Sequence, residues 1–144
     1  MSKVIRFLLV EDDEDHAELI RQSFSLERLA NRIDHVTNGE DALDFLKNVG
    51  RFAESVRPHV VLLDLNLPRM SGLDVLERIK DDPKLRQIPV VMLTTSEAPA
   101  DRARAYEHNA NSFVTKPIGF EQLQKVVRQL ELYWTICNQP PEVD

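Results

Sequence analysis

The chain has 144 residues, 42% of them hydrophobic and 29% charged, which suits one domain with a buried core and is too short for two. Its net charge of −6 argues against the concentrated basic face that binds nucleic acid. Cys137 is the only cysteine, which excludes a disulfide framework and a cysteine zinc site within one chain. No apolar run approaches the roughly 20 residues of a membrane span, and no signal peptide is evident, so we expect a cytoplasmic protein without a membrane partner.

Apolar runs and helical patterns alternate along the chain. In chain order we expect a strand at 4–10, a helix from about 13, a strand at 32–36, a helix after 39, a strand at 60–63, a helix after 72, a strand at 88–93, a helix from about 99, a strand at 112–115 and a helix from about 120. Short apolar runs between helices are typical of parallel strands buried on both faces. The pattern predicts an α/β fold, a doubly wound five-stranded parallel sheet in the strand order 2-1-3-4-5.

Two helices carry specific expectations about their buried stripes. The helix after residue 39 is expected to bury Ala42, Phe45, Leu46 and Val49. The last helix, from about Phe120, carries an apolar stripe at spacings of three and four: Phe120, Leu123, Val127, Leu130 and Trp134. Residues 1–132 should form the domain, and residues 133–144 an extension of the last helix and a tail, with no separate effector domain.

A reactive side chain follows four of the five predicted strands. Glu11 and Asp12 follow the first, Asp64 follows the third, Thr94 ends the fourth and Lys116 follows the last. Open α/β sheets place their sites beyond the carboxyl ends of the strands, so we expect these side chains to converge at one edge. Together they could hold a divalent cation and transfer phosphate.

The carboxylates suit Mg²⁺, which prefers oxygen ligands and keeps several waters. Asp12 and Asp64, on adjacent strands, are the expected direct ligands, and Glu11 could act through water. Alternatively, an acidic run at this point only favours the positive end of the following helix. That alternative explains residues 13–15 well, but it does not explain why Asp64 stands alone after four apolar residues.

Asp64 is the candidate nucleophile, because an ionised aspartate can accept phosphate as an acyl phosphate. Lys116 would bring a positive charge to the phosphoryl oxygens, and Thr94 would donate a hydrogen bond to one of them. Each has a simpler alternative: Lys116 as a counter-ion only, and Thr94 as a strand-end hydroxyl only. Pro117 favours the functional reading, since a cis Lys116–Pro117 bond would hold the lysine at its strand end.

Four segments in this order resemble a two-component response regulator receiver domain. They are residues 8–13 (LLVEDD), 61–72 (VLLDLNLPRMSG), 89–94 (PVVMLT) and 116–117 (KP). The resemblance covers nearly the whole chain and implies a flavodoxin-like (βα)5 fold. It also implies a phosphoacceptor that catalyses its own phosphotransfer and dephosphorylation, rather than an enzyme acting on a separate substrate.

The resemblance assigns roles to individual residues. It implies that Asp64 receives phosphate from a sensor histidine kinase and that the backbone carbonyl of Asn66 is the third protein ligand of Mg²⁺. Phe113 stands where the family keeps an aromatic switch residue, which turns inward as Thr94 moves toward the phosphate. The resulting change would alter a surface that binds a downstream protein or a phosphotransfer partner.

Two features depart from the family pattern. Thr95 stands where the family usually has a small residue, and it is expected to narrow access to Asp64. The stretch 46–58 is longer than in a minimal receiver. With the run 94–97 and the aromatic end of the last helix, this stretch resembles the small single-domain regulators that serve bacterial phytochrome kinases.

The last helix also suggests self-association. Its continuation carries Leu130, Tyr133, Trp134 and Ile136, which a monomer would leave partly in water. We expect a homodimer through the helix after 99, the strand 112–115 and the last helix, as receivers of this type often form. The alternative is that Trp134 folds back over its own domain.

Other functions suit the sequence less well. A haloacid-dehalogenase-type phosphatase also uses a strand-end aspartate, but its Asp-x-Asp pattern would need a carboxylate where Asn66 stands. A flavodoxin-like cofactor binder would need a phosphate-binding loop after the first strand, where this chain has carboxylates. A receiver that has lost phosphorylation is disfavoured because every site residue is present. His16, His35, His59 and His108 share no ligand spacing and receive no role.

Overall fold

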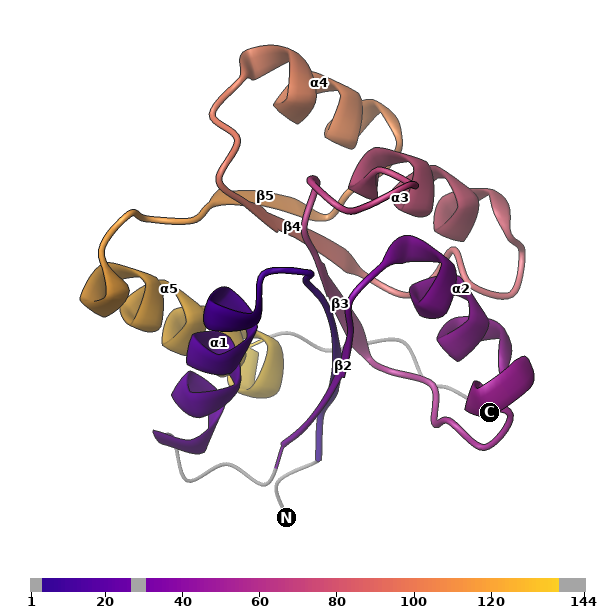
Figure 1. Ribbon diagram of the computed structural model, residues 1–144, viewed down its shortest axis with the longest axis horizontal. Helices are drawn as coiled ribbons and strands as arrows, with labels where there is room; N and C mark the ends of the chain where they lie inside the picture. Colours follow the sequence, from indigo (N-terminus) through magenta and orange to yellow (C-terminus); the bar gives the residue numbers. More distant parts are fainter. Residues whose placement is uncertain (1–3, 27–30, 138–144) are drawn as a thin grey trace.

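The structure, a computed structural model, describes residues 4–26 and 31–137. In chain order the elements are β1 (Arg6–Val10), α1 (Glu14–Leu26), β2 (Arg32–Val36), α2 (Gly39–Lys47), a 3-10 turn (Gly50–Phe52), β3 (Val60–Leu63), α3 (Gly72–Asp81), β4 (Val90–Thr94), α4 (Pro99–Glu107), β5 (Ser112–Thr115) and α5 (Phe120–Leu132). All strand pairs are parallel and the sheet order is β2-β1-β3-β4-β5 (Figure 1), which confirms the predicted fold.

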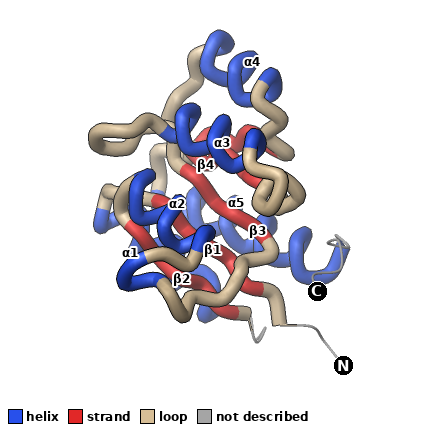
Figure 2. Tube along the Cα trace, turned by 90° about the vertical axis from the view of Figure 1, so that its right-hand side faces the viewer, coloured by secondary structure: helices blue, strands red, loops and turns tan. Residues whose placement is uncertain are grey.

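The sheet is the middle of three layers. Helices α1 and α5 cover one face, and α2, α3 and α4 cover the other (Figures 1 and 2). Successive strand residues pack on opposite faces of the sheet. Phe7 packs in a core cluster with Ile20 of α1 and Val127 of α5. Leu8 packs in the cluster on the other face, with Val75 of α3. Burial on both faces explains why the inner strands are apolar at 7–10, 60–63 and 90–93. Within the described ranges, no helix is both long and apolar enough to cross a bilayer.

Helix α2 ends earlier than its apolar spacing predicts. Asn48 is the C-cap in the left-handed conformation, with φ 59°, and its N–H donates to the carbonyls of Asp44 and Phe45. Asparagine tolerates this conformation, which stops the helix. Val49 therefore lies outside the helix and is 50% exposed, so its predicted place in the buried stripe is wrong. Strands β1 and β4 also begin two residues later than predicted, at Arg6 and Val90.

The C-terminal part of the described chain folds back on its own domain. After α5, a π-helical turn spans Tyr133–Cys137. Trp134 is only 6% exposed and packs in the core cluster between the sheet, α1 and α5. This bears out the alternative stated for Trp134 and removes it from any exposed interface. Phe120, the first residue of the apolar stripe, is 67% exposed, so the domain does not cover the whole stripe. Of the predicted extension and tail at 133–144, residues 138–144 lie outside the described residues.

One glycine fixes how α3 meets the end of β3. A Cβ atom on Gly72 would lie 2.1 Å from the backbone oxygen of Asp64, closer than any side chain could pack. The Gly72 N–H also donates to the Leu65 carbonyl at 2.8 Å. The close approach therefore requires glycine, and it holds the backbone at Asp64 in place.

Candidate functional site

The side chains of three residues that were predicted to form the site meet in one buried cluster at the carboxyl edge of the sheet. Glu11 follows β1, Asp64 follows β3 and Lys116 follows β5, and all three are buried. The Lys116 Nζ atom lies 3.1 Å from Asp64 Oδ2 and forms a closer ion pair with Glu11 Oε1. Backbone hydrogen bonds set these positions: Asp64 N–H donates to Val10 O at 3.0 Å, and Lys116 N–H donates to Thr94 O at 2.7 Å. The strand ends thus converge as predicted.

Three carboxylates form the acidic part of the site. Glu11, Asp12 and Asp64 each offer an oxygen, and these oxygens all lie within 4.8 Å of one another. Asp12 is exposed, so the cluster reaches solvent on that side. Asn66, two residues beyond Asp64, donates its N–H to Asp64 Oδ1 at 3.2 Å. Oxygen ligands so close together, with an open side, fit a divalent cation that keeps some of its water.

The pKa values of the two buried carboxyls move apart. The pKa of Glu11 is raised to about 7, mainly by burial and then by a hydrogen bond with Asp64, against the opposing effect of Lys116. Burial also acts to raise the pKa of Asp64, but the Glu11 hydrogen bond and the charge of Lys116 outweigh it, and the pKa is lowered. Without metal, Glu11 therefore binds a proton more readily than Asp64, and Asp64 is the carboxyl of the pair that ionises first as the pH rises.

The two predicted switch residues lie on neighbouring strands. Thr94 ends β4 and is fully buried, and its Oγ1 accepts a hydrogen bond from the Ser96 N–H at 3.3 Å. Phe113 lies on β5 opposite Met92, and it is partly buried against the core cluster on the α2–α4 side. Thr95, the departure from the family pattern, is exposed beside the buried Thr94.

Two histidines with no predicted role contact this cluster. His16 Nδ1 lies 3.2 Å from Lys116 Nζ, and His35 Nε2 lies 2.8 Å from the backbone oxygen of Glu11. Since a carbonyl only accepts, His35 donates through Nε2. Two features of the sequence could have pointed to these contacts. His16 lies in the first turn of the helix that follows the acidic run, and His35 lies on β2, the strand that pairs with β1.

The predicted cis peptide bond is wrong. The described residues contain no cis bond, so Lys116–Pro117 is trans. The trans form before proline is favoured by about 0.5–1 kcal/mol in any case. The lysine needs no cis bond, because its backbone is held by Thr94 and its side chain by Glu11 and Asp64.

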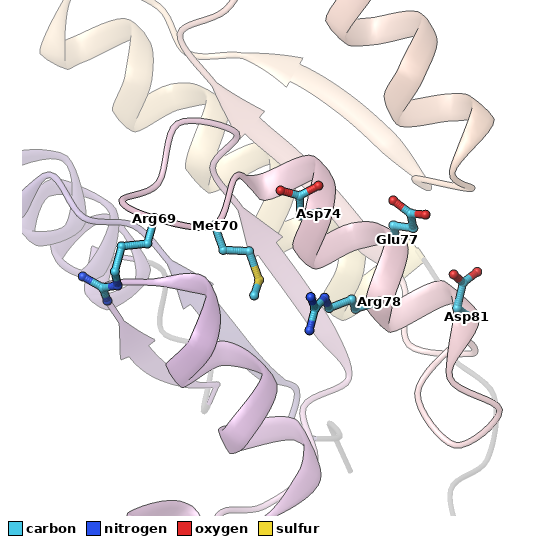
Figure 3. Close-up of a pocket in the computed structure, with 6 residues that line it drawn as sticks. All are labelled: Arg69, Met70, Asp74, Glu77, Arg78 and Asp81. Carbon is cyan, nitrogen blue, oxygen red and sulfur yellow. The ribbon is translucent and has the colours of Figure 1, made fainter.

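A pocket lies beside α3 (Figure 3). It is lined by Arg69, Met70, Asp74, Glu77, Arg78 and Asp81, none of which belongs to the predicted site. Arg69 is already engaged, since its Nε donates to Glu40 Oε2 of α2 at 2.6 Å. Both signs of charge line the pocket, so it indicates no particular class of ligand.

Comparison with known proteins identifies the family. The response regulator receiver domain family matches residues 7–128 of this chain. The chain belongs to this family. Its members take a phosphoryl group onto an aspartate in two-component signalling, and they bind a divalent cation at an acidic pocket. Membership supports the receiver over the phosphatase and flavodoxin-like alternatives.

Individual relatives cover nearly the whole chain. The probable methanogenesis regulatory protein FilR2 of Methanothrix harundinacea is 42% identical over 93% of this chain and 86% of its own length. The response regulator Rcp1 of a Synechocystis species is 37% identical over 88% of this chain and 86% of its own length. The Mn²⁺-bound crystal structure of Rcp1 aligns with a TM-score of 0.92 over 96% of this chain and 99% of its own. The phosphorylated cyanobacterial phytochrome response regulator RcpA aligns with a TM-score of 0.94 and 34% identity over 97% and 100%.

Proposed function

We propose that this receiver accepts a phosphoryl group on Asp64 from a sensor histidine kinase in a Mg²⁺-dependent reaction. The observation that carries the proposal is the setting of Asp64. It is a buried carboxylate with a lowered pKa, it lies 3.1 Å from the Lys116 ammonium, and it shares an acidic cluster with Glu11 and Asp12. A nucleophilic carboxylate must be ionised, and this setting keeps Asp64 ionised.

The proposed protein ligands of Mg²⁺ are Asp12, Asp64 and the backbone carbonyl of Asn66, with Glu11 acting through water. The closeness of the three carboxylate oxygens supports the first two, and the exposure of Asp12 leaves room for water. The ion would offset the charge of the carboxylates and polarise the phosphoryl oxygens. Lys116 would keep its ammonium beside those oxygens.

In the proposed transfer, an Asp64 carboxylate oxygen forms a bond to phosphorus while the phosphorus–nitrogen bond of the kinase phosphohistidine breaks. The electron pair of that bond stays on the imidazole nitrogen, which takes a proton from solvent. The chain itself catalyses this step and the later hydrolysis. The Thr94 hydroxyl then donates to a phosphoryl oxygen, and Phe113 follows as the second switch residue.

The partners are a further part of the proposal. A histidine kinase is implied by the receiver family, and a phytochrome-type kinase is supported by the similarity to RcpA. A homodimer through α4, β5 and α5 is supported by Tyr106 of α4, 50% exposed, and Phe120 of α5, 67% exposed. Transfer rates measured against several purified kinases would identify the cognate one.

Acetyl phosphate as donor, with intact-mass measurement, tests the acceptor function. The wild-type protein with Mg²⁺ should gain one base-labile phosphoryl group, and it should gain none when a chelator removes the metal. Asp64→Ala should gain none, whereas Asp44→Ala, a change at an exposed aspartate of α2, should label fully. Full labelling of Asp64→Ala would refute the assignment.

A further inference from the structure

The Lys116 ammonium has three hydrogens, and the structure places three acceptors around it. Two are Glu11 Oε1 and Asp64 Oδ2, and the third is His16 Nδ1 at 3.2 Å. The Lys116 side chain is only 1% exposed, so water has little room to replace any of them. His16 is therefore part of the environment that orients this lysine.

The chemistry of the contact fixes its direction. An ammonium group is only a donor, so the lone pair of His16 Nδ1 accepts and the ring proton lies on Nε2. The other polar atoms near Nδ1 are more distant, with Glu11 Oε1 at 3.8 Å and Asp13 Oδ2 at 3.9 Å. Lys116 is the nearest of these three partners.

The backbone at His16 is held where this contact can form. His16 lies in the first turn of α1, which begins at Glu14. Its N–H donates to Asp13 Oδ1 at 3.1 Å, so Asp13 caps the helix at this point. The imidazole thus comes from a fixed helix end and approaches the lysine from the α1 side.

We propose that His16 is a positioning residue for phosphoryl transfer. With Glu11, it holds two of the three N–H bonds of Lys116, which directs the third toward Asp64, where the phosphoryl group is taken up. A lysine on a flexible four-carbon stem needs such supports, because one hydrogen bond alone lets the ammonium swing. The inference rests on the proposed role of Asp64 and adds a residue that acts through Lys116.

Three variants separate positioning from a merely structural role. His16→Asn keeps an acceptor near the place of Nδ1, His16→Leu fills the space without an acceptor, and His108→Leu is a matched change at the end of α4. The first readout is the rate of phosphorylation by acetyl phosphate at saturating Mg²⁺. The second is the ¹⁵N shift of Nδ1 in the metal-free wild type, measured with and without Lys116→Met.

We expect His16→Leu to slow phosphorylation about tenfold, as loss of a hydrogen bond to a charged group would, while His16→Asn stays within about twofold of wild type. His108→Leu should label at the wild-type rate. The Nδ1 resonance should report an unprotonated, hydrogen-bonded nitrogen that changes in Lys116→Met.

Several results would overturn the inference. His16→Leu could label at the wild-type rate, His16→Asn could be as slow as His16→Leu, or the Nδ1 shift could ignore Lys116→Met. If the wild-type protein still takes up phosphate normally, these results refute the role of His16 but leave the proposed role of Asp64 intact. A wild-type protein that takes no phosphate would overturn the proposed function together with this inference.

Discussion

At the scale of single residues, Lys116 joins two roles that the sequence left as alternatives. Its ammonium lies against Glu11 and Asp64, so it is a counter-ion of the acidic cluster. The same position serves the proposed contact with a phosphoryl group on Asp64. The sequence could place these residues at strand ends, but it could not show where the proton of the pair resides, because that depends on burial and on distances across the sheet.

Glu11 should make the metal-free protein less stable as the pH rises. The pKa of Glu11 is raised from an ordinary 4.5 to about 7. Its contribution to the free energy of unfolding is therefore complete below pH 4.5 and is lost as the pH rises through about 7. The pKa of Asp64 is lowered from its ordinary 3.8, so Asp64 stabilises the fold above that pH. This stabilisation is lost only in acid, as Asp64 becomes protonated. Between pH 5 and 7.5, the free energy of unfolding without metal should fall by about 2 kcal/mol because of Glu11.

Denaturant titrations with a chelator present would measure this fall, and Glu11→Gln supplies the comparison. The variant cannot titrate at this position, so its stability should change much less over the same range. Adding Mg²⁺ at pH 7.5 should restore stability to the wild type, because the ion binds the ionised carboxylates. Parallel pH profiles for wild type and Glu11→Gln would show that Glu11 keeps an ordinary pKa.

At the scale of elements, the strands were easier to predict than the ends of the helices. Burial on both faces makes residues 7–10 of β1, 60–63 of β3 and 90–93 of β4 continuous apolar runs that the sequence shows directly. The end of α2 depends on the left-handed Asn48, and Phe120 is exposed although α5 begins at this residue as predicted. Apolar spacing alone predicts neither the end of α2 nor the exposure of Phe120. Trp134 could have packed on its own domain or on a partner, and only the fold decides between them.

Trp134 should anchor the C-terminal turn to the core. Because its side chain is nearly fully buried, Trp134→Ala should lower the free energy of unfolding by about 3 kcal/mol. Its neighbour Tyr133 is half exposed and makes an edge-to-face contact with Trp134, so Tyr133→Ala should cost less than about 1 kcal/mol. Chemical denaturation of both variants checks the difference. Equal losses would mean that Trp134 does not pack in the core.

At the scale of the whole molecule, the sheet order determines how the site is assembled. Strands β1 and β3 are neighbours, which puts the acidic pair beside Asp64, whereas β5 lies beyond β4. The residue after β5 must therefore reach past a strand, which a long lysine side chain can do. This convergence could be predicted from the sequence, because open α/β sheets gather their sites at one edge.

The switch should link the site to the surface of the molecule through Thr94. Without its hydroxyl, Thr94→Ala should still accept phosphate, but the phosphorylated form should lose the contact that distinguishes the two states. Hydrogen exchange around Phe113 and α4 should then change little on phosphorylation. Thr95→Ala, a change at the exposed neighbour, should keep the normal response. A normal response in Thr94→Ala would point to another trigger.

Self-association should depend on exposed apolar side chains of the α4–β5–α5 face. Phe120→Glu should weaken the proposed dimer, because it places a charge in the interface. Val56→Glu, a change at a half-exposed residue between α2 and β3, should leave it intact. Sedimentation at micromolar concentration, with and without phosphate, measures both. Monomeric behaviour of the wild type in both states would end the proposal.

Locating the phosphoryl group chemically decides whether Asp64 is the acceptor. Borohydride reduces an aspartyl phosphate to homoserine, so fragment sequencing of the phosphorylated, reduced protein identifies the acceptor. We expect homoserine at position 64 and nowhere else in the chain. Homoserine at position 12 with Asp64 unchanged, or a stable phosphate on another residue type, would contradict it.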